Sequence, residues 1–443
     1  MRMLEGSLDR IRNILESMRG RLWVIPAVMC VAAAGAARAV TWTDDYPILQ
    51  EIDAWWYFGG DPETARELLG TLLSGMITMT SLVISITMVV LSLAANQLGP
   101  RLIWNFIRDR QIQAVIGTFF STIVFILVVI RSVRSDDVPD VAVTAATALV
   151  GLCLFALLFH VHKVARSIIA DTVIDEVASD LLSAVAAMPD AGSRERPSGS
   201  LPDRAVSTPL SIGRSGYVQV VEYERLLRMA EREDATIRIS VRPGHFVLAS
   251  GDHAVIAADR SASEDLQAEV RSAFLVGSQR TPTQDVEYSI RHLVEIAVRA
   301  LSPGTNDPFT AVDVVHRLGA ALERLMGKDV PDCVALADSK GRLRVVGRSS
   351  TFGGMADVAL NQVRQAAASR GNAAVIISLA SMLGKLASAT RTEEHRAALL
   401  HHLRATARAA ERALDDPADR ADFDAAASRA KDHLLSRSYA SPE

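Results

Sequence analysis

The sequence predicts a membrane α-helical bundle of four transmembrane helices, followed by a cytosolic α+β domain with a small β-barrel-like part and a helical part. Two observations favour this fold class. Four apolar stretches lie within the first 165 residues, and charged residues are scarce there but dense afterwards. Each stretch approaches or exceeds the ~20 apolar residues that cross ~30 Å of hydrocarbon. We therefore expect an integral membrane protein and exclude a soluble enzyme.

The expected boundaries follow the hydropathy of the chain. A cytoplasmic segment at 1–21 precedes a transmembrane domain at 22–165, with spans near 22–40, 68–98, 114–130 and 141–161 and an acidic outer segment at 41–67. A stalk helix at 166–188, a flexible Pro/Ser/Gly-rich linker at 189–209, a small β-rich module at 210–260 and a mainly helical domain at 261–443 with a short strand pair complete the chain.

Arginine placement predicts the orientation. The segment before the first span is rich in arginine, and the loop between spans two and three carries Arg101, Arg108 and Arg110. The segment 41–67 holds seven acidic residues against Arg66. Because cytoplasmic loops carry the excess of positive charge, we expect both termini in the cytoplasm. All five tryptophans fall at expected membrane edges, where their rings prefer to lie.

A cleaved signal peptide is the alternative for the first span. A basic start precedes the apolar run, and the small-residue stretch at 36–39 loosely resembles a cleavage site. The 21-residue leader is long for a signal peptide. Cleavage would leave the other three spans where they are, so the alternative does not change the rest of the layout.

The second span carries a line of polar residues, here called the hydroxyl seam. It consists of Ser74, Thr78, Ser81, Ser85, Ser92 and Asn96, at steps of four, three, four, seven and four. This spacing places them on one face of a helix. The seam would line a hydrated path in an assembly of several subunits, because hydroxyls replace part of an ion's water shell. Alternatively, small hydroxyl residues let helices approach closely and hydrogen-bond.

The two ends of the seam carry opposite charge. Arg101, Arg108 and Arg110 would either attract anions to a pore mouth or anchor in lipid headgroups. The acidic outer segment would concentrate cations, or it simply reflects the usual composition of outer loops. The choice between cations and anions therefore stays open at the sequence level.

Strand patterns follow the linker. Strands are expected at 216–221 and 236–241 with a short helix at 222–233 between them, and 242–247 turns into a further strand. The turn resembles the hairpins of lipoyl and biotinyl carrier domains. Those carriers need a lysine at the hairpin tip, and the chain has none between Lys163 and Lys328. A small β-barrel without a swinging-arm cofactor remains.

Helices dominate the remainder. Residues 281–285 are expected to open a helix with hydroxyl caps, and Asp307 before Pro308 to begin the next. A strand pair is expected at 334–336 and 343–346, a helix from 354 onward, and alanine-rich helices at 392–414 and 417–437.

Several long motif strings occur together in the chain. They are Ala-Leu-Ser-Pro-Gly-Thr-Asn-Asp-Pro-Phe-Thr-Ala at 300–311, Arg280-Thr281 with Gln284-Asp285, and, in the second span, Ser85-Ile86-Thr87, Leu91-Ser92-Leu93-Ala94, Gln97 and Pro100-Arg101. The set resembles the DUF2254 family of predicted bacterial membrane proteins over nearly the whole chain. The resemblance implies an inner (cell) membrane protein of unknown function with this layout. It supplies no catalytic residues.

Four polar residues of the C-terminal region have two interpretations. Arg280, Asp285, Asn306 and Asp307 would form a pocket for a small ligand or cation at a helix-turn-helix junction, or they only cap helices and tie turns. His395, His401 and His402 are interpreted as solvated surface residues, since no acidic or cysteine partner sits at ligand spacing on that helix face. We expect no metal site.

The sequence gives little indication of other functions. The three scattered cysteines are typical of neither disulfides nor a zinc site, and a net charge of −4 gives no indication of nucleic acid. Phosphate-loop, zinc-protease, nucleophile-elbow and dinucleotide motifs do not occur, so we expect neither an enzyme nor a cofactor.

These observations favour a homo-oligomeric membrane protein, channel-like or transporting ions or small solutes, whose cytosolic domain regulates it through the stalk. Its expected partners are the lipid bilayer and further copies of itself. The alternative is a membrane-anchored sensor or scaffold whose cytosolic domain binds a ligand or partner without transport. An enzyme on the membrane face is a third class.

Overall fold

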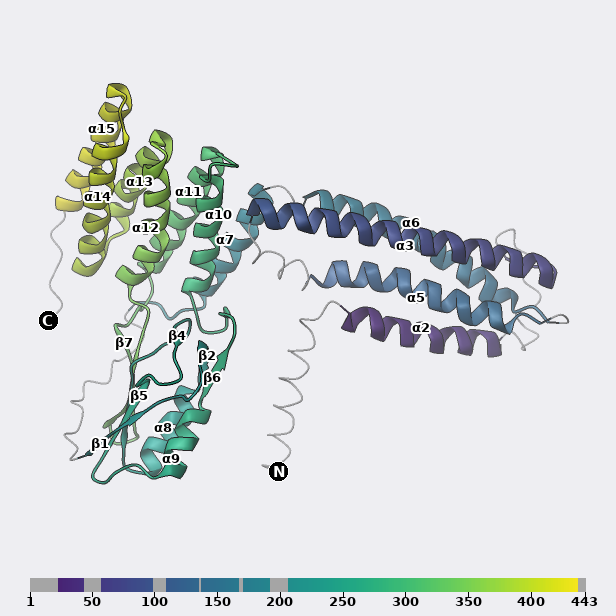
Figure 1. Cartoon of the computed structure of the whole chain (residues 1–443), viewed down its shortest axis with the longest axis horizontal. Coiled ribbons are helices and arrows are strands. Elements are labelled where there is room, and N and C mark those ends of the chain that lie inside the picture. Colours follow the sequence, from purple (N-terminus) through teal and green to yellow (C-terminus); the bar gives the residue numbers. More distant parts are fainter. Residues whose placement is uncertain are drawn as a thin grey trace. The chain divides into compact units, whose positions relative to one another are not determined.

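The computed structural model describes residues 23–43, 57–98, 109–134, 137–166, 170–191 and 206–436. The chain divides into two compact units, Met1–Thr172 and Val173–Glu443. Figure 1 shows long helices in the first unit and a mixture of strands and shorter helices in the second. The expected order, apolar helices first and an α+β region afterwards, is confirmed.

The N-terminal unit is a bundle of long helices. They are α2 (Val24–Thr43), α3 (Pro62–Leu98), α5 (Arg110–Ser132) and α6 (Asp140–Arg166). Within the described residues these four helices are long and apolar enough to cross a membrane, as the sequence predicts. In α5, 56% of the residues in the apolar stretch are buried, against 11–22% in the other three helices. Helix α5 is therefore the centre of the bundle, and it contacts α2, α3 and α6 (Figure 1).

Polar contacts fix the two ends of α5. At its start, Asp109 accepts hydrogen bonds from the backbone amides of Gln111 and Ile112, and so caps the helix. Lys163 of α6 forms an ion pair with Asp109. At the other end, Arg66 of α3 donates to the carbonyl of Val133, at an Nη2–O distance of 2.9 Å. These contacts join α5 to α3 and α6.

The C-terminal unit contains two open sheets. The first has the order β1 (Val206–Leu210), β5 (Ala254–Ala258), β3 (Thr236–Ile239), β8 (Leu343–Arg348), β7 (Cys333–Ala337), and the second has the order β4 (Phe246–Val247), β2 (Gly216–Val221), β6 (Phe274–Gly277). Neighbouring strands are antiparallel except β3 and β8, where Ile237 lies beside Val345. Helices α8 (Tyr223–Arg232) and α9 (Glu264–Ser272) accompany the sheets.

The expected β-barrel-like part is wrong, because neither sheet closes. Alternating burial along single strands predicts that a sheet covers a core, but it does not tell which strands become neighbours. The strand pair at 333–348 joins the edge of β3, so strands far apart in the sequence share one sheet. Strand β1 starts inside the expected linker 189–209, and Asp190 pairs with Lys328.

Stacked helical pairs form the rest of this unit. They are α10 (Glu287–Ala300) with α11 (Pro308–Leu325), α12 (Phe352–Ser369) with α13 (Ala373–Leu386), and α14 (Glu393–Ala413) with α15 (Pro417–Leu435), the short 3₁₀ turn Ala387–Ala389 following α13. Each helix contacts the helix two positions further on, from α10–α12 to α13–α15 (Figure 1). The pairs therefore stack in two layers.

The expected stalk belongs in part to this helical stack. Helix α6 is described up to Arg166 and α7 (Ala170–Ala186) begins after three residues outside the described part. The apolar side chains of Leu181 and Val185 in α7 line a small interior cavity together with Leu322 of α11. The amine of Lys328 donates to the carbonyl of Ala186, the last residue of α7, at 3.1 Å and to that of Met188 at 3.0 Å.

Two expectations for the helical part are wrong. The helix expected to open at 281–285 begins at Glu287 without a side-chain cap, because the carboxylate of Asp285 pairs with Arg280 instead of backbone amides. His395 and His402 are not solvated, with exposed fractions of 6% and 2%. Both lie on the inner face of α14, which the alanine-rich sequence does not distinguish from its outer face. His401 is exposed, as expected.

Candidate functional site

The two faces of α3 differ in their surroundings. One face is buried in the bundle and consists of Ala65, Leu69, Met76, Thr80, Val83 and Thr87, each at most 7% exposed. The hydroxyl seam is exposed at Ser74, Thr78, Ser81, Ser85 and Ser92, while the side chain of Asn96 lies outside the described residues. At ~3.6 residues per turn, the seam is roughly 180° away from the buried face. The seam is therefore not an internal contact of its own subunit.

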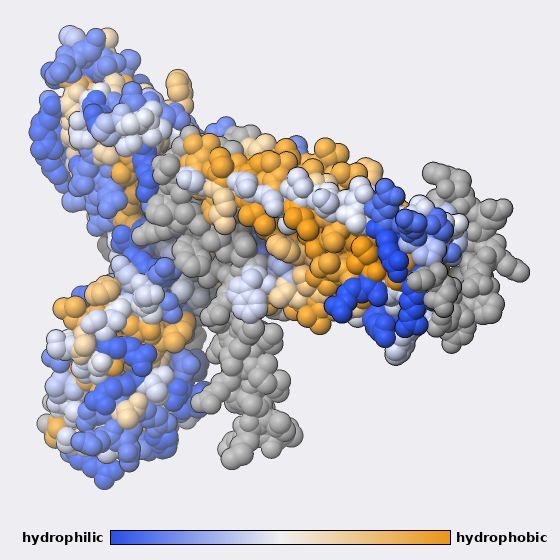
Figure 2. Space-filling model, turned by 45° about the vertical axis from the view of Figure 1, so that its right-hand side comes forward, coloured by the Kyte–Doolittle hydropathy of each residue, from blue (hydrophilic) through white to orange (hydrophobic). Residues whose placement is uncertain are grey.

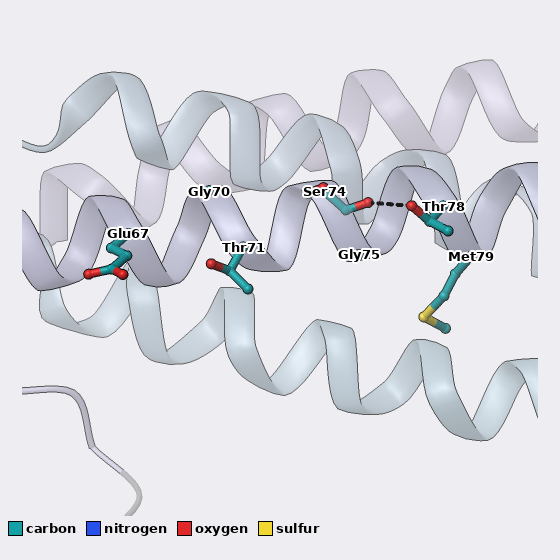
Figure 3. A pocket seen from close by; sticks show the side chains of 7 residues that line it. All are labelled: Glu67, Gly70, Thr71, Ser74, Gly75, Thr78 and Met79. Carbon is teal, nitrogen blue, oxygen red and sulfur yellow. Dashed lines mark hydrogen bonds between the residues drawn. The ribbon is translucent and has the colours of Figure 1, made fainter.

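An open groove follows the first half of the seam. It is lined by Glu67, Gly70, Thr71, Ser74, Gly75, Thr78 and Met79, which follow one another along α3 (Figure 3). A Cβ atom added at Gly70 or Gly75 would meet no atom within 4 Å. The groove is therefore open space along α3.

The seam hydroxyls differ in their hydrogen bonds. Thr78 donates from Oγ1 to the carbonyl of Ser74 at 3.0 Å (Figure 3), an ordinary way for a hydroxyl to satisfy itself on a helix. Ser81, Ser85 and Ser92 form no hydrogen bond with the described residues. These three hydroxyls are available to water, an ion or another chain.

A second polar contact lies on the opposite, buried side of α3. The hydroxyl of Thr87 is 2.8 Å from Nε2 of His160 in α6, and His160 is 1% exposed. Its Nδ1 is buried without a hydrogen-bond partner in the described residues. Ionisable residues within a membrane span are expensive and are typical of functional positions. Sequence reasoning did not single out His160, although its place in an apolar run was a visible signal.

The expected mouth residues are only partly described. Arg101 and Arg108 lie outside the described residues, and Arg110 is the exposed first residue of α5. Of the acidic outer segment, Glu63 and Glu67 are exposed on α3, whereas residues 44–56 lie outside the described part.

In the C-terminal unit, Arg280 and Asp285 belong to a buried ion network of Arg242, Arg280, Asp285, Glu287 and Arg291. The Nε atom of Arg280 is 2.7 Å from Oδ2 of Asp285. The carboxylate of Glu287 forms an ion pair with Arg242 at an N–O distance of 2.6 Å. It also lies 3.5 Å from the guanidinium of Arg291 and 3.7 Å from that of Arg280. The side chains of Asp285 and Glu287 are 1% and 2% exposed. Sequence reasoning missed Arg242, Glu287 and Arg291.

The network is closely packed. Gly244 has a φ of +87°, and a Cβ atom there would lie 2.4 Å from both Arg280 and Asp285, so glycine alone fits. Burial raises the pKa of Asp285, and the adjacent Arg280 opposes that shift. Burial, reinforced by Arg242, lowers the pKa of His245. This arrangement ties the β4 turn to the start of α10 and leaves no room for a ligand beside Gly244.

Asn306 and Asp307 lie apart from this network. Asp307 caps α11, since its Oδ1 accepts from the amide of Thr310 at 3.2 Å and its Oδ2 from the Thr310 hydroxyl at 2.6 Å. Asn306 has a φ of +46° and is exposed in the turn. Asn306 and Asp307 follow the C-terminal end of α10, whereas Glu287 of the network is at its N-terminal end. The two ends are roughly 20 Å apart along the helix axis. The structure therefore does not bring the four residues into one pocket.

Among the described residues, no cluster of three or more His, Cys, Asp or Glu side chains is arranged to hold a metal ion. Cys30, Cys153 and Cys333 are free thiols.

The fold and these sites define a class: a membrane protein with four candidate spans and a C-terminal α+β unit. The family described as predicted membrane protein (DUF2254) matches residues 19–385, and the chain belongs to this family. It is similar to uncharacterized proteins of Mycobacterium bovis and Mycobacterium tuberculosis, each 29% identical over 436 residues, which cover 96% of this chain and 82% of the relative. No solved structure matches the chain.

Proposed function

We propose that this protein forms a homo-oligomer in the bacterial inner membrane and conducts or transports ions or small solutes along the outward face of α3. Both termini lie in the cytoplasm, and the C-terminal unit regulates the path. The observation that carries the proposal is the position of the hydroxyl seam, which is exposed and opposite the buried face of α3.

The exposed surfaces of α6 and α3 differ. That of α6 presents bulky apolar side chains such as Leu152, Phe155 and Leu158, exposed by 54–74%, as expected of a helix that faces lipid. The exposed surface of α3 instead mixes the seam hydroxyls with apolar side chains such as Leu82 and Val89, exposed by 54% and 68%, and Figure 2 shows a pale band crossing orange surface of the N-terminal unit. Hydrocarbon offers no hydrogen bonds, so this face favours contact with further copies and with water.

Hydroxyl side chains also suit conduction. They replace part of the hydration shell of a passing ion or solute without fixing a charge in the membrane. The free hydroxyls of Ser81 and Ser85 lie in the middle of α3, where a path through the hydrocarbon must be lined. In the proposed assembly, α3 helices from several copies surround this path.

Regulation would reach α3 through α6. The sequence leads from α6 at Arg166 almost directly into α7, which contributes to the core of the C-terminal unit. A movement of α7 would pull on α6, and the bond between His160 and Thr87 would pass that movement to α3. The contact thus joins α6 to the seam-bearing helix.

The test is flux through the full chain reconstituted in liposomes. Ser81→Leu and Ser85→Leu are expected to abolish flux and leave the oligomer intact, because leucine removes the hydroxyl and fills the path. Thr147→Leu is the matched control, since Thr147 is an exposed hydroxyl residue of α6 that donates to its own helix. Equal flux in all variants, or single-particle images that show no passage beside the seam, would reject the proposal.

One observation favours a second candidate function, a membrane-anchored sensor or scaffold. The three-stranded sheet exposes Phe246 and Leu275, and Leu248 follows β4 directly; all three are exposed by 55–63%, and the rings of Tyr217 and Phe246 are 5.1 Å apart. An exposed apolar patch of this kind is typical of a protein contact. Absence of flux in the wild type, together with a partner that Phe246→Ser releases, would favour this function.

A further inference from the structure

Glu67 occupies a special place on α3. It lies on the same face as the hydroxyl seam, one turn before Thr71, and lines the same groove as Ser74 and Thr78 (Figure 3). Its side chain is exposed, and it forms no hydrogen bond or ion pair with the described residues. An exposed carboxylate therefore stands at the end of the seam that is expected to face outward.

Two neighbouring charges near the start of α3 are engaged in other contacts. Asp61 accepts a hydrogen bond from the hydroxyl of Thr64 at 2.5 Å and is occupied with the first turn. Arg66, the adjacent positive charge, donates to the carbonyl of Val133 on its own subunit. Arg66 thus points to another side of the helix than Glu67, and its charge is not paired with that carboxylate. Glu63, one turn further out, is also exposed on this face.

We infer that the Glu67 carboxylates of the assembled copies form a ring at the outer end of the path and make it select small inorganic cations over anions. This inference rests on the proposed function, because a ring exists only if α3 lines the path. It names the substrate class that the seam hydroxyls alone leave open.

The physical reason is the position of the charge. Rings of acidic side chains are a general way to build cation selectivity, because they raise the local concentration of cations and repel anions. A carboxylate within ~6 Å of a passing ion in a watery path changes its local concentration by about threefold, in opposite directions for the two signs. The cation-to-anion ratio therefore changes by about tenfold for each carboxylate near the ion. Several copies act together.

The experiment measures the reversal potential of the reconstituted full chain in a KCl gradient. The wild type is expected to prefer K⁺ over Cl⁻, and Glu67→Gln to lower the permeability ratio by about tenfold or more. Glu67→Asp keeps the charge and should keep most of the preference. Asp137→Asn is the matched control, because Asp137 is an exposed acidic residue between α5 and α6, on the same expected side of the membrane but off α3.

Each other outcome has a distinct meaning. A conducting wild type that prefers Cl⁻, or a Glu67→Gln variant with an unchanged ratio, would overturn the inference and leave the proposed function standing. A wild type without any ion flux would remove the proposed function and the inference with it. Failure of Glu67→Gln to assemble, while Glu67→Asp assembles, would place the carboxylate in a helix contact and overturn its role in selection.

Discussion

Replacing Glu287 by glutamine removes the central charge of the buried ion network. The substitution leaves Arg242, Arg280 and Arg291 around the single carboxylate of Asp285. Their side chains are 17%, 12% and 38% exposed, so solvent compensates the lost charge only in part. Breaking a buried ion pair by removing one partner costs about 3–5 kcal/mol. We expect the C-terminal unit to lose that much stability.

The assay must follow the C-terminal unit alone. All five tryptophans precede residue 105, so tryptophan fluorescence reports the other unit, and thermal proteolysis with mass detection of C-terminal fragments is the suitable measurement. A loss of 3–5 kcal/mol lowers the midpoint by roughly 6–20 °C for a unit of this size. The control is Glu295→Gln, which removes a more exposed partner of Arg299 at 3.6 Å and should cost about 1 kcal/mol or less. Equal shifts for both variants would refute the reasoning.

Three further predictions concern other contacts. Burial lowers the pKa of His402 to about 4. As the pH falls below ~6.5, the unfolded chain therefore binds a proton before the folded chain does, and the free energy of unfolding should decrease by about 2 kcal/mol at pH 5. His402→Asn should flatten this decrease. Gly244→Ala should cost more than Gly341→Ala in the same proteolysis assay, because both residues have positive φ but only Gly244 has atoms within 4 Å. Thr87→Val should destabilise the bundle by about 1 kcal/mol more than Thr80→Val in detergent unfolding followed by tryptophan fluorescence, because Thr80 bonds only its own helix.

Contrary results would be equally informative. A pH profile that is the same with and without His402 would mean that another group takes up the protons. Equal costs for the two glycine variants would show that the contacts of Gly244 relax easily. A Thr80→Val variant as unstable as Thr87→Val would remove the interhelical bond as a source of stability.

The spans were predictable because a run of ~20 apolar residues has few other uses. The sequence predicted that the seam residues share one helix face, because the helical period places Ser74, Thr78 and Ser81 together. It did not predict whether this face is exposed or buried, because residues of the opposite face, such as Leu69 and Met76, are no more apolar than those that face lipid on other helices. Only the packing of α3 on α5 and α6 decides which face is buried.

Long-range partners set the limit for the C-terminal unit. Arg242 and Glu287 are 45 positions apart and meet through the fold, so no local pattern connects them. The parallel pairing of Ile237 with Val345 also joins positions far apart in the sequence. No local pattern predicts this pairing, so the sequence predicted a barrel where the structure has an open sheet. By contrast, the Asp307 cap of α11 is a local bond, and the sequence alone predicted it.

The stacked helical pairs make the C-terminal unit nearly one-dimensional. Each pair contacts its immediate neighbours, so its stability is the sum of its own folding and one or two interfaces, as in a short lattice of coupled units. Of the two ends of the stack among the described helices, the α10–α11 end packs against α7, whose Leu181 and Val185 share a small cavity with Ile290 and Leu322, whereas α14 and α15 form the other end. Opening should therefore begin at α14 and α15 and reach α10, with the buried ion network at its start, last.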